Sequence, residues 1–148
     1  MKVLDLGCGN AKYKSKDNLV IGVDNAKLKN VDVVHNLNKF PYPFKNNEFD
    51  AVLLFDILEH GDDRAILLEA KRVCKKRILV IVPKVVDNEL QKSGIIFRHY
   101  IEKSHLREYD EEDLRTLCKL AGLKISLFQT VHFLFNETIF LSLFDVSL

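Results

Sequence analysis

The sequence predicts an α/β fold built on a doubly wound, mostly parallel sheet of about seven strands with a C-terminal antiparallel hairpin. Three observations predict it. Short apolar runs alternate with polar or amphipathic segments, as in parallel strands covered by helices. Two of those segments have helical periodicity, and the last two apolar runs have no helix between them. With 148 residues, 47% of them hydrophobic, the chain is expected to form one domain over 1–148.

Five strands are expected in the first part of the chain, at continuous runs rich in Val, Ile and Leu. Such runs are typical of parallel strands that are buried on both faces. The fifth run stops at a proline, which cannot donate a hydrogen bond to a neighbouring strand. The expected strands cover residues 3–6, 19–23, 32–35, 50–55 and 77–82.

Two amphipathic helices are expected between and after these strands. The first covers residues 62–76, begins at a capping aspartate and ends with Lys75 and Lys76, where the helix dipole favours cations. The second covers residues 110–122, with acidic residues in its first turn and a glycine as its stop signal.

The C-terminal apolar runs, residues 123–130 and 137–146, predict two strands that pair antiparallel at one edge of the sheet. Aromatic residues are frequent here, and they are expected to pack in the core and on the edge strand. A second use is a contact surface for a homodimer or a partner chain. These aromatic residues are Phe133, Phe135, Phe140 and Phe144.

Composition excludes several classes of partner. The 22 basic and 21 acidic side chains balance to a net charge of +1, which gives no signal for nucleic acid or a membrane surface. No apolar run is long enough to cross a bilayer. Three widely spaced cysteines without a signal peptide predict a reduced, cytoplasmic protein. The sequence contains no CxxC-type cluster, so no metal site is expected.

A glycine turn after the first strand is the main sign of a ligand site. Gly7 and Gly9 allow the backbone to approach a ligand, and Asp24 ends the second strand, where an acid can accept from ribose hydroxyls. A dinucleotide fits poorly, because Lys12 replaces the third glycine and residues 10–18 are too short and polar for a phosphate-binding helix. A ligand with ribose but no phosphate fits better.

Several ordered motifs extend this interpretation. VLDLGCGN, VIGVD and VVHNLNKFPYPFKNNEFDAVLLFDILEH closely resemble class I S-adenosylmethionine-dependent methyltransferases, which have a Rossmann-like fold, and in particular the type 11-like branch. The resemblance covers residues 3–83, and HLREYDEEDLRTLCKLAGLKI extends it to about residue 125. Relatives usually carry helices before the first strand, so this chain resembles a short form without them. A second chain or a large substrate could then cover the cofactor.

The resemblance implies S-adenosyl-L-methionine as cofactor and S-adenosyl-L-homocysteine as product. In the family, the acid within the first strand helps to hold the methionine end, and the glycine loop passes under the methionine and ribose. The acid after the second strand binds the ribose, the following residues flank the adenine, and the end of the fourth strand lies beside the methionine. The matching residues are Asp5, Gly7, Cys8, Gly9, Asp24, Asn25, Asn36, Leu37, Phe55 and Asp56.

The implied reaction is an in-line displacement at the sulfonium methyl carbon, which needs no metal. His60 and His105 are the candidate general bases, and a structural role for His60 is the alternative. VPK follows the fifth strand in place of the NPPY-type motif of enzymes that methylate amino groups of DNA. Cys8 belongs to the cofactor loop, which disfavours a covalent cysteine mechanism. The expected acceptor is a small molecule or a protein side chain.

Three functions therefore remain open from the sequence. The first is a methyltransferase acting on an unidentified acceptor, in first place a small molecule. The second is a cofactor-binding but catalytically silent subunit that needs a partner chain. The third is a nucleotide-linked oxidoreductase with a shortened nucleotide-binding half, which the missing third glycine disfavours.

Overall fold

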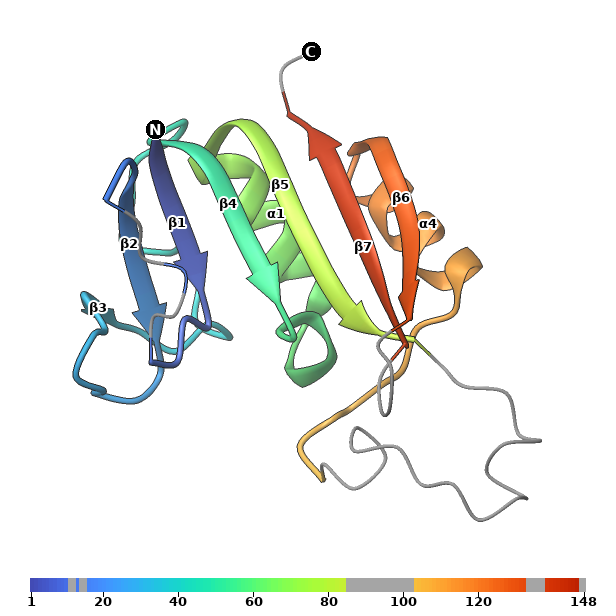
Figure 1. The fold of residues 1–148 in the computed structure, drawn as a ribbon, viewed down its shortest axis with the longest axis horizontal. Coiled ribbons are helices and arrows are strands. Elements are labelled where there is room, and N and C mark those ends of the chain that lie inside the picture. Colours follow the sequence, from blue (N-terminus) through green and yellow to red (C-terminus); the bar gives the residue numbers. More distant parts are fainter. Residues whose placement is uncertain (11–12, 14–15, 85–102, 133–137, 147–148) are drawn as a thin grey trace.

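The computed structural model describes residues 1–10, 13, 16–84, 103–132 and 138–146, and one seven-stranded sheet organises them (Figure 1). The strand order is β3-β2-β1-β4-β5-β7-β6. The strands are β1 (Lys2–Leu6), β2 (Leu19–Asp24), β3 (Val33–Val34), β4 (Phe49–Phe55), β5 (Cys74–Pro83), β6 (Lys124–His132) and β7 (Thr138–Asp145).

The pairing confirms the fold class expected from the sequence. β1 to β5 form a parallel sheet, and β7 runs antiparallel to both of its neighbours, β5 and β6. The last strand of the chain thus lies inside the sheet, and β6 forms the edge. Phe144 of β7 is fully buried, as expected for core packing. Phe133 and Phe135 lie outside the described residues, as does the side chain of Phe140.

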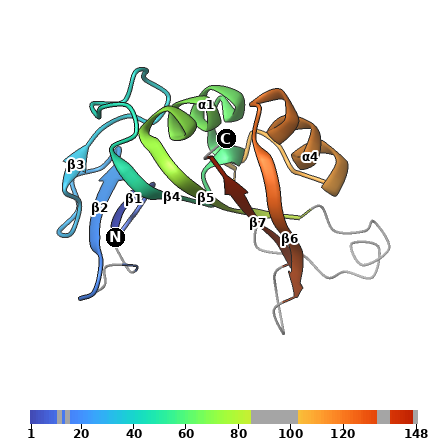
Figure 2. The same cartoon turned by 90° about the horizontal axis from the view of Figure 1, so that it is seen from above.

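The helices α1 (Asp63–Val73) and α4 (Glu111–Leu120) lie on the same face of the sheet, and the short 3-10 helix η1 (Leu58–His60) precedes α1 (Figure 2). Asp62 caps α1 by accepting from the amide of Ala65, and Asp110 caps α4 through a capping box. No helix in the described part of the chain is long and apolar enough to cross a membrane.

Burial alternates along the central strands, so the expectation that they are buried on both faces holds for one face, and the other face is only half-buried. Val52 and Leu54 are fully buried, whereas Leu53 between them is only half-buried. Leu79, which pairs with Leu53 in the neighbouring strand β5, is half-buried as well. The reason lies in the helices. Within the described residues, α1 and α4 cover one face, and the side chains on the other face keep part of their exposure.

The end of α1 differs from the sequence prediction. The helix stops at Val73 and β5 begins directly at Cys74, so Lys75 and Lys76 belong to the strand instead of a last helical turn. The last helical carbonyls accept hydrogen bonds from two backbone amides that precede β4, with N···O distances of 2.8 and 2.9 Å. Tertiary contacts therefore satisfy the end of the helix and set its length.

Arg72 fixes the segment that leads into β4 against α1. Its guanidinium donates to the carboxylate of Glu69 at 2.8 Å and to the carbonyls of Phe44 and Tyr42 at 2.8 and 3.1 Å. It also donates to Oδ1 of Asn46 at 2.9 Å, and Glu69 accepts from the amide of Tyr42 at 2.8 Å. The Arg72 guanidinium lowers the pKa of Glu69. One side chain thus satisfies three separate acceptor groups in this segment.

We expect Arg72→Met to lower the free energy of unfolding by about 2–3 kcal/mol, because the Phe44 carbonyl and the Asn46 carboxamide lose the guanidinium donor and Glu69 loses its charged partner. Arg77→Met is the matched control. Arg77 pairs with Asp145 at 3.5 Å, and its side chain is 64% exposed, so that substitution is expected to cost less than about 0.5 kcal/mol. Urea unfolding measures both values. Equal losses in the two variants would contradict this role for Arg72.

Candidate functional site

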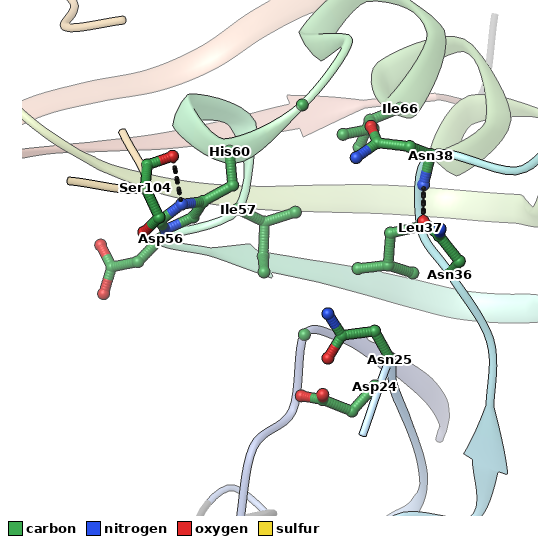
Figure 3. A pocket seen from close by; sticks show the side chains of 12 residues that line it. Asp24, Asn25, Asn36, Leu37, Asn38, Asp56, Ile57, His60, Ile66 and Ser104 are labelled. Carbon is green, nitrogen blue, oxygen red and sulfur yellow. Dashed lines mark hydrogen bonds between the residues drawn. The ribbon is translucent and has the colours of Figure 1, made fainter. Parts of the chain in front are cut away.

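A cavity of about 430 Å³ opens where β1, β2 and β4 end, at the carboxyl edge of the parallel strands (Figure 3). This is the edge at which open α/β sheets bind their ligands. The volume lies within the range of about 300–1,000 Å³ that is typical of small-molecule sites. The sequence-predicted residues that line it are Gly7, Asp24, Asn25, Asn36, Leu37, Asp56 and His60.

The turn after β1 forms the floor of the cavity. The amides of Gly7 and Cys8 both donate to the carbonyl of Val23, at 2.8 and 3.0 Å, which joins the ends of β1 and β2. Gly7 has a φ of 73°, and a Cβ there would overlap the side chain of Ile57. The sequence needs glycine at this position for both backbone conformation and space.

Asp24 is the acid expected at the ribose position, and it faces the cavity. Its two carboxylate oxygens accept from the amides of Gly9 and Ala26 at 2.9 and 3.0 Å. A carboxylate offers about four acceptor positions, so two remain for a ligand. The carboxylate therefore both orders the glycine turn and presents acceptors to the cavity.

A polar segment after β3 forms the opposite wall. Figure 3 shows Asn36, Leu37 and Asn38 along this side, facing Asp24 and Asn25. Oδ1 of Asn36 accepts from the amide of Asn38 at 2.9 Å, so one of its acceptor positions is already used within the loop. This local bond holds the carboxamide in place beside the cavity.

The end of β4 supplies the third side. Asp56 has a left-handed φ of 53°, and its amide donates to the carbonyl of Ile81 in the neighbouring strand at 2.9 Å. Non-glycine residues with a left-handed backbone conformation are frequent at ligand-binding sites, where surrounding contacts hold the strained backbone in place. The turn directs the chain from β4 across the cavity into η1.

Four of the expected cofactor residues do not line the cavity. Asp5 and Cys8 are buried, and the ring of Phe55 packs against Tyr13 at 4.9 Å between centroids. Gly9 has a φ of 51°, and no described residue comes within 4 Å of where its Cβ would be. Asp5 and Cys8 lie in β1 and in the turn that follows it. From these positions, Asp5 and Cys8 can support the glycine turn from below the cavity surface.

The thiol of Cys8 is not a nucleophile in this arrangement. Burial and the nearby carboxylates of Asp5, Asp24 and Asp32 raise its pKa to about 11. The thiol therefore stays protonated at neutral pH. This agrees with the expectation that Cys8 belongs to the loop and takes no covalent part in a reaction.

The cavity also contains residues that the sequence did not point to. Gly61 lies so close to Asn38 that a Cβ would overlap the carboxamide, and Oδ1 of Asn38 accepts from the amide of Asp62 at 3.2 Å. These contacts join the wall after β3 to the start of α1. The missed lining residues are Asn38, Ile57, Gly61, Ile66 and Ser104.

The two candidate bases lie together beside the cavity. The rings of His60 and His105 have centroids 4.7 Å apart in an edge-to-face arrangement. Nδ1 of His60 lies 3.2 Å from the carbonyl of Ser104, and the amide of Leu106 donates to the carbonyl of Glu59 at 2.8 Å. The segment before α4 is thus held against η1, and it brings His105 to the site.

Glu59 lies beneath this pair and is only 1% exposed. Neither carboxylate oxygen has a hydrogen-bond partner among the described residues. Desolvation, together with the charge of Asp56, raises its pKa to about 8. In the sequence, Glu59 is only the second-last residue of the motif that ends in FDILEH. A buried carboxyl group without a compensating partner is costly, so its presence here calls for an explanation.

The sheet order and the polar cavity at the carboxyl edge define the class I methyltransferase fold. The chain belongs to the methyltransferase domain family: the sequence model described as "Methyltransferase domain" matches residues 4–82. The resemblance to S-adenosylmethionine-dependent methyltransferases is thereby confirmed. The match runs from β1 into β5 and includes every residue that lines the cavity except Ser104.

One curated relative is an uncharacterized protein from Methanocaldococcus jannaschii, 29% identical over 143 residues. The match covers 89% of this chain, and the chain spans only 59% of the length of that relative.

Two solved structures illustrate the likeness of the fold. The 1,6-didemethyltoxoflavin-N1-methyltransferase of Burkholderia thailandensis, with bound 1,6-didemethyltoxoflavin and S-adenosylhomocysteine, has a TM-score of 0.75 and 15% identity, covering 99% of this chain and 71% of that one. A Haloferax volcanii complex of the Trm112 methyltransferase activator and a methyltransferase has a TM-score of 0.72 and 14% identity, covering 99% and 83%. At these identities the likeness concerns the fold.

Proposed function

We propose that this chain is an S-adenosylmethionine-dependent methyltransferase that acts on a small-molecule acceptor in the cavity. The observation that carries the proposal is the position of Asp24, whose carboxylate joins the glycine turn and keeps acceptor positions toward the cavity. Membership of the methyltransferase domain family supports the same assignment. The three cysteines are buried and unpaired, which fits the reduced, cytoplasmic setting expected from the sequence.

The residues present fit the cofactor. Asp24 would accept from the ribose hydroxyls, and Asn25, Asn36 and Leu37 would flank the adenine. Gly7 leaves room where a side chain would overlap Ile57, so the ligand can approach the backbone of the turn. Asp5, Cys8 and Gly9 act as positioning residues for the turn, and the backbone of Phe55 and Asp56 borders the methionine end.

S-adenosylmethionine supplies an activated methyl group on a sulfonium, so the protein has to align the acceptor, exclude water and remove a proton. Alignment of this kind can lower the activation barrier by roughly 7–11 kcal/mol. His60 and His105 are the groups that can take the proton. Because the carbonyl of Ser104 can only accept, the contact with Nδ1 of His60 favours the tautomer that carries its proton on Nδ1, in which Nε2 has the lone pair that a base needs.

The second candidate function is a cofactor-binding, catalytically silent subunit that requires a partner chain. The Haloferax volcanii structure, in which a chain of the same fold is in complex with the Trm112 activator, is the observation that favours this second function. In this chain, the C-terminal hairpin of β6 and β7 is the proposed contact surface, because β6 forms the edge of the sheet.

Methyl transfer by the purified chain separates these two functions. The chain is incubated with methyl-labelled S-adenosylmethionine and a set of metabolites that carry hydroxyl, amine or carboxylate groups. The enzyme proposal predicts a labelled small molecule, and a decrease of about 10²–10⁴-fold in the rate if His60→Ala removes the base. Cofactor binding without a labelled product in any set would favour the silent subunit.

A further inference from the structure

The cluster of Glu59, His60 and His105 has the composition of a metal-binding site. Each residue offers one ligand atom, and these atoms all lie within 4.8 Å of one another. Ligands of a shared ion at bond lengths of about 2.0–2.2 Å lie roughly 3–4 Å apart, so small side-chain rotations close the difference. Two imidazoles and one carboxylate are a donor set that suits zinc, iron, cobalt or nickel.

Two further observations point to an ion in this cluster. The carboxylate of Glu59 is buried, and within the described residues neither oxygen has a hydrogen-bond partner, so a cation would supply the missing interaction. His60 directs Nδ1 toward the carbonyl of Ser104 at 3.2 Å. A histidine that donates to a backbone carbonyl in this way has its ring oriented and the lone pair of its other nitrogen available for a metal.

We propose that Glu59, His60 and His105 bind a divalent first-row transition-metal ion, and that this ion holds an oxygen atom of the methyl acceptor. Three protein ligands leave coordination positions open, and His60 and Ser104 line the cavity, so the open positions can face it (Figure 3). The first half of the proposal stands on the cluster alone. The second half rests on the proposed methyltransferase function.

The ion would activate a hydroxyl group that receives the methyl group. With the ion bound, His60 and His105 are its ligands and do not act as bases. The ion lowers the pKa of a bound hydroxyl, and the proton passes to water. The oxygen lone pair then forms the bond to the methyl carbon while the carbon–sulfur bond breaks and its electron pair stays on sulfur. No sequence pattern indicates this site, because His105 lies far along the chain from Glu59 and His60 and is brought near them only by the segment before α4.

The test is a titration of the metal-free chain with cobalt(II), followed by its visible absorption. The proposal predicts saturation at about one equivalent for the wild type. Glu59→Gln and His105→Ala are expected to weaken binding by at least about tenfold. His35→Ala is the matched control, because His35 is half-buried and its ring contacts the carbonyl of Lys39 at 2.8 Å, away from the cluster. This control should bind cobalt as the wild type does.

Two results would overturn the metal site: no saturable spectrum, or binding that neither cluster substitution weakens, which means adventitious surface binding only. Circular dichroism checks that each variant is folded, and the half-buried His105 gives a usable variant if Glu59→Gln does not fold. Loss of binding in a folded His105→Ala chain supports the site.

The acceptor half has its own readout. Acetohydroxamate, a bidentate oxygen ligand, should change the spectrum of the cobalt-loaded wild type if open positions face the cavity, and an unchanged spectrum would overturn this half. S-adenosylhomocysteine binding is measured separately. Cobalt binding at the cluster without any S-adenosylhomocysteine binding would leave the metal site standing and remove the methyltransferase function.

Discussion

Asp24→Ala is expected to weaken the binding of S-adenosylhomocysteine by about 100-fold, measured by isothermal titration calorimetry. The carboxylate is proposed to accept two hydrogen bonds from the ribose, and bonds to a charged acceptor are worth about 1.5–3 kcal/mol each. A loss of about 3 kcal/mol corresponds to roughly 100-fold in affinity. Asp24 also accepts from the amide of Gly9, so its removal loosens the turn that faces the ligand.

Two variants control this experiment. Asp24→Asn keeps the size and one acceptor oxygen, and we expect an intermediate loss of about tenfold. Asp50→Asn changes an acid near the start of β4, where it accepts from the amide of Lys2 at 2.9 Å, far from the carboxyl edge. It should leave the affinity unchanged. A similar affinity for wild type and Asp24→Ala would remove Asp24 from the site.

Gly7→Ala is expected to lower the free energy of unfolding by about 2–5 kcal/mol. A left-handed φ costs a residue with a Cβ about 1–2 kcal/mol, and the overlap with Ile57 adds about 1–3 kcal/mol of overpacking. Because Ile57 lines the cavity, its displacement should also weaken ligand binding. Urea unfolding and calorimetry measure the two effects on the same protein.

Gly9→Ala is the matched comparison within the same turn. Gly9 also has a positive φ, but no atom of the described residues lies within 4 Å of the position that its Cβ would take. We therefore expect only the backbone cost of about 1–2 kcal/mol. Losses of equal size in the two variants would mean that the space beside Ile57 does not explain the need for Gly7.

The central strands could be predicted from the sequence because their signal is local. Each is a continuous apolar run, and the five runs map onto β1 to β5 in order. The end of α1 could not be predicted this way. Lys75 and Lys76 have a helical pattern, but amides preceding β4 satisfy the last helical carbonyls and the chain turns into β5 at Cys74. The place of β7 between β5 and β6 likewise depends on contacts between distant segments.

The same distinction applies to the site. Gly7 and Asp24 follow directly after strands, and parallel strands bring their carboxyl ends to one edge, so sequence position was enough to place both at the cavity. Ser104 lies 44 positions after His60, and only the fold brings the two together. The partnerless carboxylate of Glu59 is a property of packing, and no sequence pattern contains it.

The central claim is that the cavity binds an S-adenosyl ligand, and thermal unfolding with S-adenosylhomocysteine, S-adenosylmethionine and NAD added separately tests it most directly. A ligand at 100 times its dissociation constant adds about 2.7 kcal/mol, a rise of roughly 5–10 °C in the midpoint for a domain of this size. We predict this rise with both S-adenosyl ligands and its loss in Asp24→Ala. A rise with NAD alone, or with none of the three, would contradict the claim.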